Sequence, residues 1–258
     1  MENLDFELKT EKETAETGRF VIEPLPAGYG VTLGNALRRV LLSSLPGGAI
    51  AEVRIQGISH PFSTIKGLKE DVVELILNLK KVRFSLQGGG PYEATLEVKG
   101  KKTVSAKDIK VSSEVLIANP DLKIATLTDK DAKLSATLVV ERGVGYKPVE
   151  EREGGRVGVI PIDSIFSPVI NVAFWTEGTR VGRKTNFERL ILEITTDCTI
   201  RPSAALAETA AILRGYFDKI SLSSASRKAA KPAAAAAEKA KKQPKKETSP
   251  RKKSVSKK

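Results

Sequence analysis

The 258-residue sequence predicts an α+β fold with largely antiparallel sheets. Runs of alternating apolar and polar residues, which are typical of strands, outnumber the helical patterns. Strands and helices do not alternate regularly, which argues against a doubly wound parallel sheet. The composition changes at Ser223 to a segment rich in Lys and Ala, in which Val255 is the only large aliphatic residue after Pro232. Such a segment cannot bury enough apolar surface to offset its ordering entropy, so we expect residues 223–258 to be a disordered tail.

Periodicity and turn residues place the elements along the chain. They predict a strand over 19–25, a helix from Thr32, a strand over 49–56, a helix over 70–82, a hairpin over 82–100, strands over 115–118, 123–128 and 133–146, two long strands within 170–196, and a helix from Pro202. We expect Thr32 to cap the first helix and Pro46-Gly47-Gly48 to end it. The hairpin is predicted to turn at Gly88-Gly89-Gly90-Pro91, and residues 178–186 are predicted to join the two long strands.

The first helix places a leucine on its polar side. At about 100° per residue, its apolar face carries Leu33, Leu37, Val40 and Leu41. Arg38 and Arg39 lie on the opposite side, as a solvent-exposed face requires, but Leu42 lies between them. Two interpretations remain open from this pattern alone. Leu42 is an ordinary exposed leucine, or it is an apolar contact rimmed by arginines that binds a partner.

Few residues support chemistry by this chain alone. Cys198 and His60 are the only cysteine and histidine, so a zinc site built from Cys and His is excluded within one chain. The glycines of the turn, Gly28, Gly30 and Gly34, lack the spacing of a dinucleotide or P-loop motif, which favours a structural turn over a phosphate site. We therefore predict no catalytic residue, no cofactor site and no metal site. The lone cysteine and the lack of a long apolar run fit a cytoplasmic protein.

The positive charge is concentrated in the tail. Residues 223–258 hold 13 Lys and Arg against 2 Glu, a net charge of +11 out of the chain's +12. Residues 1–222 therefore carry a net charge of +1. Any electrostatic attraction to a polyanion should come from the tail rather than from the folded part.

Five runs of sequence, in this order, resemble the bacterial-type RNA polymerase alpha subunit, specifically its N-terminal assembly region. They are EPLPAGYGVTLGNALRRVLLSSLPG, STIKGLKEDVVELILNLK, VERGVGYKPV, IDSIFSPVINVAF and LILEITTDCTIRP. The resemblance covers residues 19–222. It implies a discontinuous dimerisation domain from 1–46 and 173–222, with a mainly antiparallel β domain inserted over 47–172. It also implies a noncatalytic subunit that homodimerises and then binds the β and β′ subunits, with the catalytic magnesium ion in β′.

The resemblance also assigns roles to individual residues. Arg39 and Leu42 match positions implicated in β binding, and Lys80 and Val169 match positions implicated in large-subunit contact; Arg38 joins this set from the helix pattern. The dimer interface is expected to include Leu33, Leu37, Val40, Leu41, Leu206, Ala210, Leu213 and Phe217.

Two features depart from the family pattern. Many members carry Gly where this chain has Cys198, and a cysteine there costs about 1 kcal/mol if the turn needs a positive φ. The basic tail stands where the family usually continues into a DNA-binding domain, so we expect only weak or indirect DNA contact. The expected location is cytoplasmic and nucleoid-associated. The alternative is a stray paralogue that acts as a basic-tailed nucleic-acid-binding protein outside the polymerase.

Overall fold

The computed structural model describes residues 6–152, 158–182 and 184–240, and its fold is α+β with antiparallel sheets, as predicted. The described residues up to Ile212 form one compact unit, and those from Leu213 form another. The helices are α1 (Tyr29–Ser43), α2 (Val72–Leu79), α3 (Pro202–Ala240) and the short 3-10 turns η1 (Ala106–Asp108) and η2 (Val149–Glu151). Within these ranges, every helix is too short or too polar to span a bilayer.

The strands form two main sheets. They are β1 (Glu7–Glu13), β2 (Thr17–Pro26), β3 (Pro46–Ile55), β4 (Phe84–Leu86), β5 (Tyr92–Lys99), β6 (Lys102–Ser105), β7 (Ile109–Lys110), β8 (Val115–Ile117), β9 (Lys123–Leu127), β10 (Lys133–Val144), β11 (Tyr146–Lys147), β12 (Ile160–Pro161), β13 (Ser164–Ile165), β14 (Val169–Val181) and β15 (Lys184–Thr196). One sheet has the order β1-β2-β15-β14, and the other has the order β7-β5-β10-β3-β4-β8 with β12 paired to β3.

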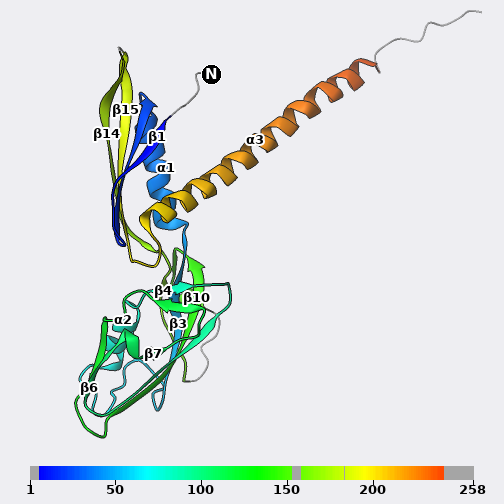
Figure 1. The fold of residues 1–258 in the computed structure, drawn as a ribbon. Helices are drawn as coiled ribbons and strands as arrows, with labels where there is room; N and C mark the ends of the chain where they lie inside the picture. The colour runs from blue at the N-terminus through cyan, green and yellow to red at the C-terminus, as the bar shows by residue number, and fades with distance from the viewer. Residues whose placement is uncertain (1–5, 153–157, 183, 241–258) are drawn as a thin grey trace, which may run out of the picture. The chain divides into compact units, whose positions relative to one another are not determined.

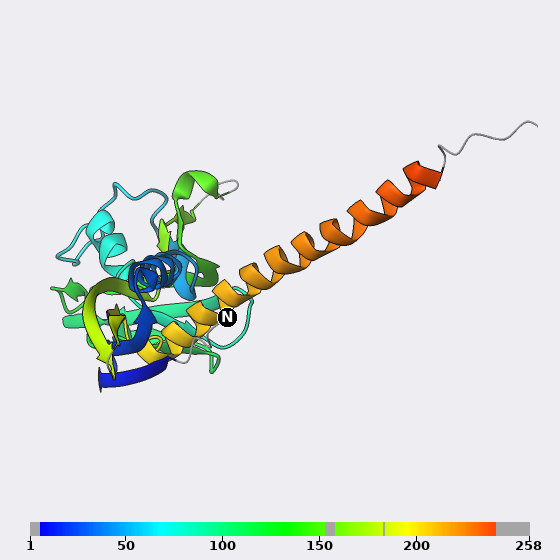
Figure 2. The ribbon, with the colours of Figure 1, turned by 90° about the horizontal axis from the view of Figure 1, so that it is seen from above.

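Helix α1 packs closely on the four-stranded sheet, mainly on β14 (Figure 1). The helix is seen nearly end-on in Figure 2. A Cβ atom at Gly34 would lie 2.4 Å from the Phe174 ring, and one at Gly30 would lie 2.6 Å from Thr176. Only glycine permits this approach, so the glycine turn serves packing, as the structural interpretation predicted.

The seven-stranded sheet encloses the larger core together with α2. The three α2 side chains that face this core, Val72, Leu75 and Leu79, are fully buried, and they pack among apolar residues of β3, β5, β9 and β10. The sequence predicted this helix from the spacing of Val73, Ile76, Leu77 and Leu79. The helix is confirmed, but of these four side chains only Leu79 is buried, and Leu77 is exposed.

Two predicted connections are wrong. β4 and β5 do not pair with each other, because β10 and β3 lie between them in the sheet. The glycine-rich segment over 88–91 therefore crosses two strands instead of closing a hairpin. The residues predicted to join the long strands mostly belong to the strands themselves, since β14 and β15 stay paired as far as Val181 and Lys184.

Two further differences concern the ends of the chain. The patterns missed β1, whose seven residues are all exposed and show no apolar alternation. The backbone of α3 continues to Ala240 and so includes the first residues of the predicted tail. Alanine and lysine are strong helix formers. Residues 241–258 of the predicted tail lie outside the described residues.

The two sheets draw on different parts of the chain. The four-stranded sheet joins residues 7–26 to residues 169–196, and the seven-stranded sheet is built from residues 46–144 and 160–161. The division into a discontinuous dimerisation domain and an inserted domain remains a prediction.

Candidate functional site

The glycine turn before α1 is closed by a carboxylate from the same chain. Gly28 has a φ of 84°. Its N–H donates to Oε1 of Glu188 at 2.9 Å, and the N–H of Gly30 donates to Oε2 at 3.2 Å. Helix N-termini attract anions, and here Glu188 occupies that position. The cap predicted at Thr32 is wrong, because α1 already begins at Tyr29 and the Thr32 hydroxyl donates to the Gly28 carbonyl.

The outer face of α1 carries the residues that the sequence singled out. Arg38 and Arg39 are exposed, and Leu42 is half-buried. The Ser167 hydroxyl donates to the Leu42 carbonyl at 3.2 Å, so the segment before β14 holds this end of the helix. The helix ends at Ser43, while Pro46-Gly47-Gly48 begins β3 instead of forming the predicted stop.

A turn around Tyr146 adjoins this end of α1. Val144 pairs with Pro46, and Tyr146 pairs with Ile165. A Cβ atom at Gly145 would lie 3.6 Å from the Ser43 carbonyl oxygen, which places the turn against the last residue of the helix. The exposed fractions of Val144, Tyr146 and Ile165 are 53%, 56% and 38%. We call these three side chains the Tyr146 surface.

An ion pair lies beside the Tyr146 ring. Nζ of Lys80 lies 3.1 Å from Oδ2 of Asp163 and 5.8 Å from the centroid of the Tyr146 ring. The hydrogen bond from Lys80 and then that from the Val149 N–H lower the pKa of the Asp163 carboxyl. Asp163 is therefore ionised at neutral pH, and the pair persists there.

Helix α3 exposes a second group of apolar side chains. Tyr216 and Phe217 are 65% and 63% exposed, one helical turn after the half-buried Leu213. The helix begins at Pro202, and the carboxylate of Glu13 accepts a hydrogen bond from the Ser203 N–H at 3.0 Å. This bond stabilises the N-terminus of the helix. The hydrogen bond from the Ser203 side chain and then that from its N–H lower the pKa of Glu13.

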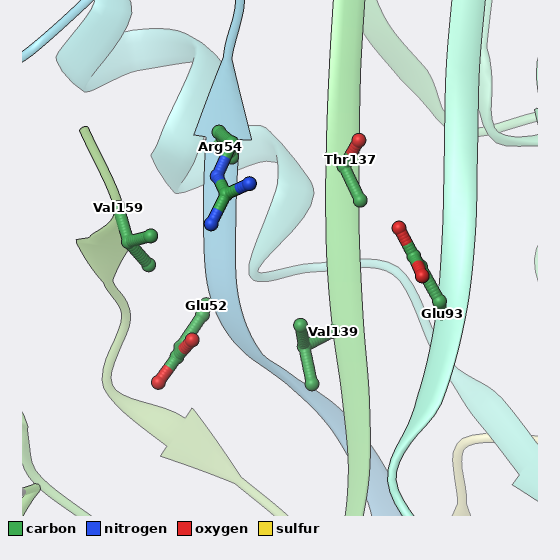
Figure 3. Close-up of a pocket in the computed structure, with 6 residues that line it drawn as sticks. All are labelled: Glu52, Arg54, Glu93, Thr137, Val139 and Val159. Carbon is green, nitrogen blue, oxygen red and sulfur yellow. The ribbon is translucent and has the colours of Figure 1, made fainter. Parts of the chain in front are cut away.

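A hollow on one face of the seven-stranded sheet is lined by charged and small side chains (Figure 3). They are Glu52, Arg54, Glu93, Thr137, Val139 and Val159. Val139 pairs with Glu52 on one side and Glu93 on the other, as expected for the solvent-exposed face of an antiparallel sheet. None of the site residues predicted from the sequence lines this hollow.

The comparisons with known proteins agree with the resemblance. The family described as RNA polymerase Rpb3/RpoA insert domain matches residues 53–167. A protein of Symbiobacterium thermophilum named DNA-directed RNA polymerase subunit alpha is 46% identical over 84% of this chain and 70% of its own length. The chain belongs to the bacterial RNA polymerase alpha subunit family.

Other alpha subunits match over a similar region. Those of Carboxydothermus hydrogenoformans and Desulforudis audaxviator are 47% and 51% identical over 80% and 76% of this chain. The matched regions cover 66% and 62% of these two relatives, so the chain spans about two thirds of the length of the alpha subunits it matches.

The alpha subunit residues predicted to contact a large subunit are not equally open. Arg38 and Arg39 are exposed, Leu42 is half-buried, and the Lys80 side chain is 24% exposed because it pairs with Asp163. Val169 is 4% exposed and belongs to the core. These contacts remain predictions. Arg38 and Arg39 of α1 are the most accessible residues among the five.

The alpha subunit residues predicted at the dimer interface divide in the same way. Leu37, Leu41 and Leu206 are buried within the chain, Leu33, Val40 and Leu213 are half-buried, and Ala210 and Phe217 are exposed. The apolar face of α1 packs on the sheet of its own chain, because the glycines bring the helix close to β14. The role of all eight residues in dimerisation remains a prediction.

Sequence reasoning missed the Tyr146 surface. Val144 and Tyr146 continue the alternating pattern of β10 and were therefore assigned to a strand without a further role. The signal that was available is Gly143-Val144-Gly145, because two glycines beside a tyrosine indicate a turn that exposes it.

Proposed function

We propose that this chain is a noncatalytic alpha subunit of DNA-dependent RNA polymerase, which homodimerises and then binds the β and β′ subunits. The observation that carries the proposal is the exposure of large apolar side chains on two separate elements, α3 and the turn beside α1. Both sheets already have filled cores, so these side chains are not needed for packing within the chain. Exposed apolar groups of this kind are typical of protein–protein interfaces.

Helix α3 is the first of these surfaces, and we assign it to a second copy of the chain. Tyr216 and Phe217 together present two aromatic rings on consecutive residues, with Leu213 one turn away. Aromatic side chains are enriched in interfaces because they bury a large apolar area for little loss of side-chain entropy. The relatives are named as alpha subunits, and the resemblance to that family implies a homodimer, which supports this assignment.

The second surface combines the end of α1 with the Tyr146 surface, and we assign it to a large subunit. Arg38 and Arg39 supply charged groups at its edge, and Leu42, Tyr146 and Ile165 supply apolar contact. An apolar centre with arginine around it is the composition of binding hot spots. The catalytic magnesium ion and the chemistry would belong to β′, and this chain would hold the large subunits together at the nucleoid in the cytoplasm.

Co-purification tests the proposal. The tagged chain is co-expressed with the β and β′ subunits of its own source and isolated through the tag at moderate salt. We expect both large subunits to elute with the chain in stoichiometric amounts, and the chain alone to sediment as a dimer. A monomer that retains neither large subunit would contradict the proposal.

A second candidate function is weak DNA binding by the basic tail. The observation that favours it is the net charge of +11 on residues 223–258 beside a body of +1. Neutralising DNA phosphates with lysines releases counterions, so affinity depends steeply on salt and little on sequence. The two surfaces proposed above do not account for this charge.

Truncation tests the tail. The full chain, a chain ending at Leu222 and a chain with the tail lysines and arginines changed to glutamine are compared for duplex DNA binding between about 50 and 200 mM salt. We expect only the full chain to bind, with an affinity that falls at least 100-fold over this range. Equal binding by all three would contradict this function. Tail-dependent binding by a chain that fails to capture large subunits would support the alternative of a nucleic-acid-binding protein outside the polymerase.

A further inference from the structure

The chain passes between the two main sheets twice, and the two crossings touch. Ser44-Leu45 leads from α1 to β3, and Ser167-Pro168 leads from β13 to β14. A Cβ atom at Gly47 would overlap the Phe166 carbonyl oxygen, so the backbones at the two crossings are in direct contact. Two crossings at one place act as a hinge, and the angle between the sheets is fixed only if a further contact bridges it.

Arg83 lies on one side of this hinge, between α2 and β4, and its backbone is held firmly. Its N–H donates to Oδ1 of Asn119 at 2.9 Å, and its carbonyl accepts the N–H of Ala118 at 2.9 Å. The amide of Asn119 donates in turn to the Lys81 carbonyl at 2.9 Å. Because both backbone groups of Arg83 are bonded, its side chain extends from a fixed point on the seven-stranded sheet's side.

Asp197 lies on the other side of the hinge, in the turn after β15. Its N–H donates to the Pro168 carbonyl at 3.0 Å. Its Oδ1 accepts both the N–H and the hydroxyl of Thr199, across Cys198 with its φ of 68°. The turn therefore holds the carboxylate in one orientation and leaves Oδ2 for another partner. The Asp197 side chain is only 7% exposed, and a carboxylate so covered from water requires a compensating charge.

The guanidinium of Arg83 reaches both sides of the second crossing. Its Nη1 donates to the Ile165 carbonyl at 3.5 Å, before the crossing, and its Nε lies 3.7 Å from Oδ2 of Asp197, after it. Among the residues that the structure describes, no other ion pair joins the part of the chain between the crossings to the part outside them. One side chain thus braces the hinge.

We propose that Arg83 and Asp197 are positioning residues, which form a clamp that fixes the angle between the two sheets. The inference is independent of the proposed function, because it concerns the geometry of one chain. The clamp presents the surfaces carried by the two sheets in one preset arrangement. A partner that contacts both sides therefore does not have to order the hinge when it binds, and that cost is removed from the binding free energy.

A clamp and a merely stabilising contact predict different results when the pair is broken. A stabilising contact affects the free energy of unfolding and leaves the angle between the sheets unchanged, whereas loss of a clamp changes that angle in the folded chain. Asp197→Asn is the decisive variant, because asparagine keeps an oxygen for Thr199 and loses the charge that faces Arg83. Arg83→Met keeps an apolar stem and leaves the backbone bonds of residue 83 in place.

The experiment measures residual dipolar couplings of the backbone amides in the two sheets of the full, perdeuterated chain. We expect one alignment tensor to fit both sheets of the wild type. Asp197→Asn and Arg83→Met should each raise the share of rotated arrangements about 5-fold, as for the loss of a partly exposed ion pair, so that the two sheets need different tensors. The double variant should go no further, because both changes remove the same contact.

Arg54→Met is the matched control, since Arg54 is exposed on β3, and its sheets should share one tensor as in the wild type. If both sheets of Asp197→Asn still fit the wild-type tensor, the inference is overturned, and this variant decides alone should Arg83→Met fail to fold. Two different tensors in the wild type, or a change in Arg54→Met as large as in the clamp variants, would overturn it as well. None of these results depends on whether the chain binds a large subunit.

Discussion

Leu42 is the residue of α1 that we propose as a contact for a partner. It lies on the outer side of α1, half-buried, with its carbonyl bound by Ser167 and with exposed arginines on the same side of the helix. The core of the sheet under α1 is filled by Leu37 and Leu41, so Leu42 is not required there.

We therefore expect Leu42→Asp to leave the dimer intact and to weaken capture of β about 10-fold or more, because the change places a charge in a contact that must lose water. Sedimentation of the variant and its affinity for β check this. Leu116→Asp, at a leucine that is 57% exposed, is the control and should leave capture unchanged. If Leu42→Asp failed to dimerise, the assignment of the outer face of α1 to a large subunit would be wrong.

Cys198 has a positive φ, which is the condition under which the sequence predicted backbone strain in the turn before α3. Its φ is 68°, in the left-handed region that costs a residue with a Cβ atom about 1 kcal/mol or more. Cys198→Gly should therefore raise the free energy of unfolding by about 1 kcal/mol, measured by urea denaturation. Cys198→Ala keeps the Cβ atom and should show no gain. A stabilised alanine variant would mean that the thiol, and not the backbone, is the source of strain.

At the scale of elements, Glu70 links the start of α2 to β9. Its carboxylate accepts hydrogen bonds from the N–H and the hydroxyl of Thr126 and pairs with Lys123 at 3.0 Å, and the residue is only 6% exposed. Burial raises the pKa of Glu70, but these bonds outweigh burial and hold the pKa below its ordinary value of 4.5.

A depressed pKa in the folded state stabilises the fold above the unfolded pKa, and that stability is lost as the pH falls through the folded pKa. Glu70→Gln should thus lower the free energy of unfolding by about 2 kcal/mol at pH 7, with a gap from the wild type that closes below pH 4. Urea unfolding at both pH values checks this. A gap that is absent at pH 7, or that widens in acid, would contradict the assigned role.

Helix α3 gives the sharpest test of the dimer surface. Phe217→Glu should convert the dimer to a monomer, because it places a charge where an aromatic ring would be covered by the second copy. Ala211→Glu is the matched control, since Ala211 is exposed on the other side of the same helix. Sedimentation of both variants tests this prediction. If the Phe217→Glu variant remained a dimer, the interface would lie elsewhere.

Elements with one buried face could be predicted from the sequence, and those without one could not. The period of α2 and the alternation in β10 follow from burial of one side. Strand β1 has no buried residue and therefore leaves no pattern. The start of α1 was misplaced because its N-terminal contact is Glu188, which is 160 residues away in sequence.

For the whole molecule, the sequence predicted the class of fold and the family, but strand order needed the structure. A glycine-rich segment such as 88–91 indicates a change of direction and does not say which strands will pair, because pairing depends on distant segments of the chain. The outer side of α1 was predicted, whereas the Tyr146 surface and the Lys80–Asp163 pair were missed. These depend on β11, β13 and α2 meeting in space, which no local pattern records.

The mass of the reconstituted assembly tests the central claim most directly. The purified chain is mixed with the β and β′ subunits, and intact complexes are weighed by native mass spectrometry. The account predicts a dimer of the chain alone and, with the large subunits, a complex that holds two copies of the chain, one β and one β′. A chain that stays monomeric and enters no complex with either large subunit would contradict it.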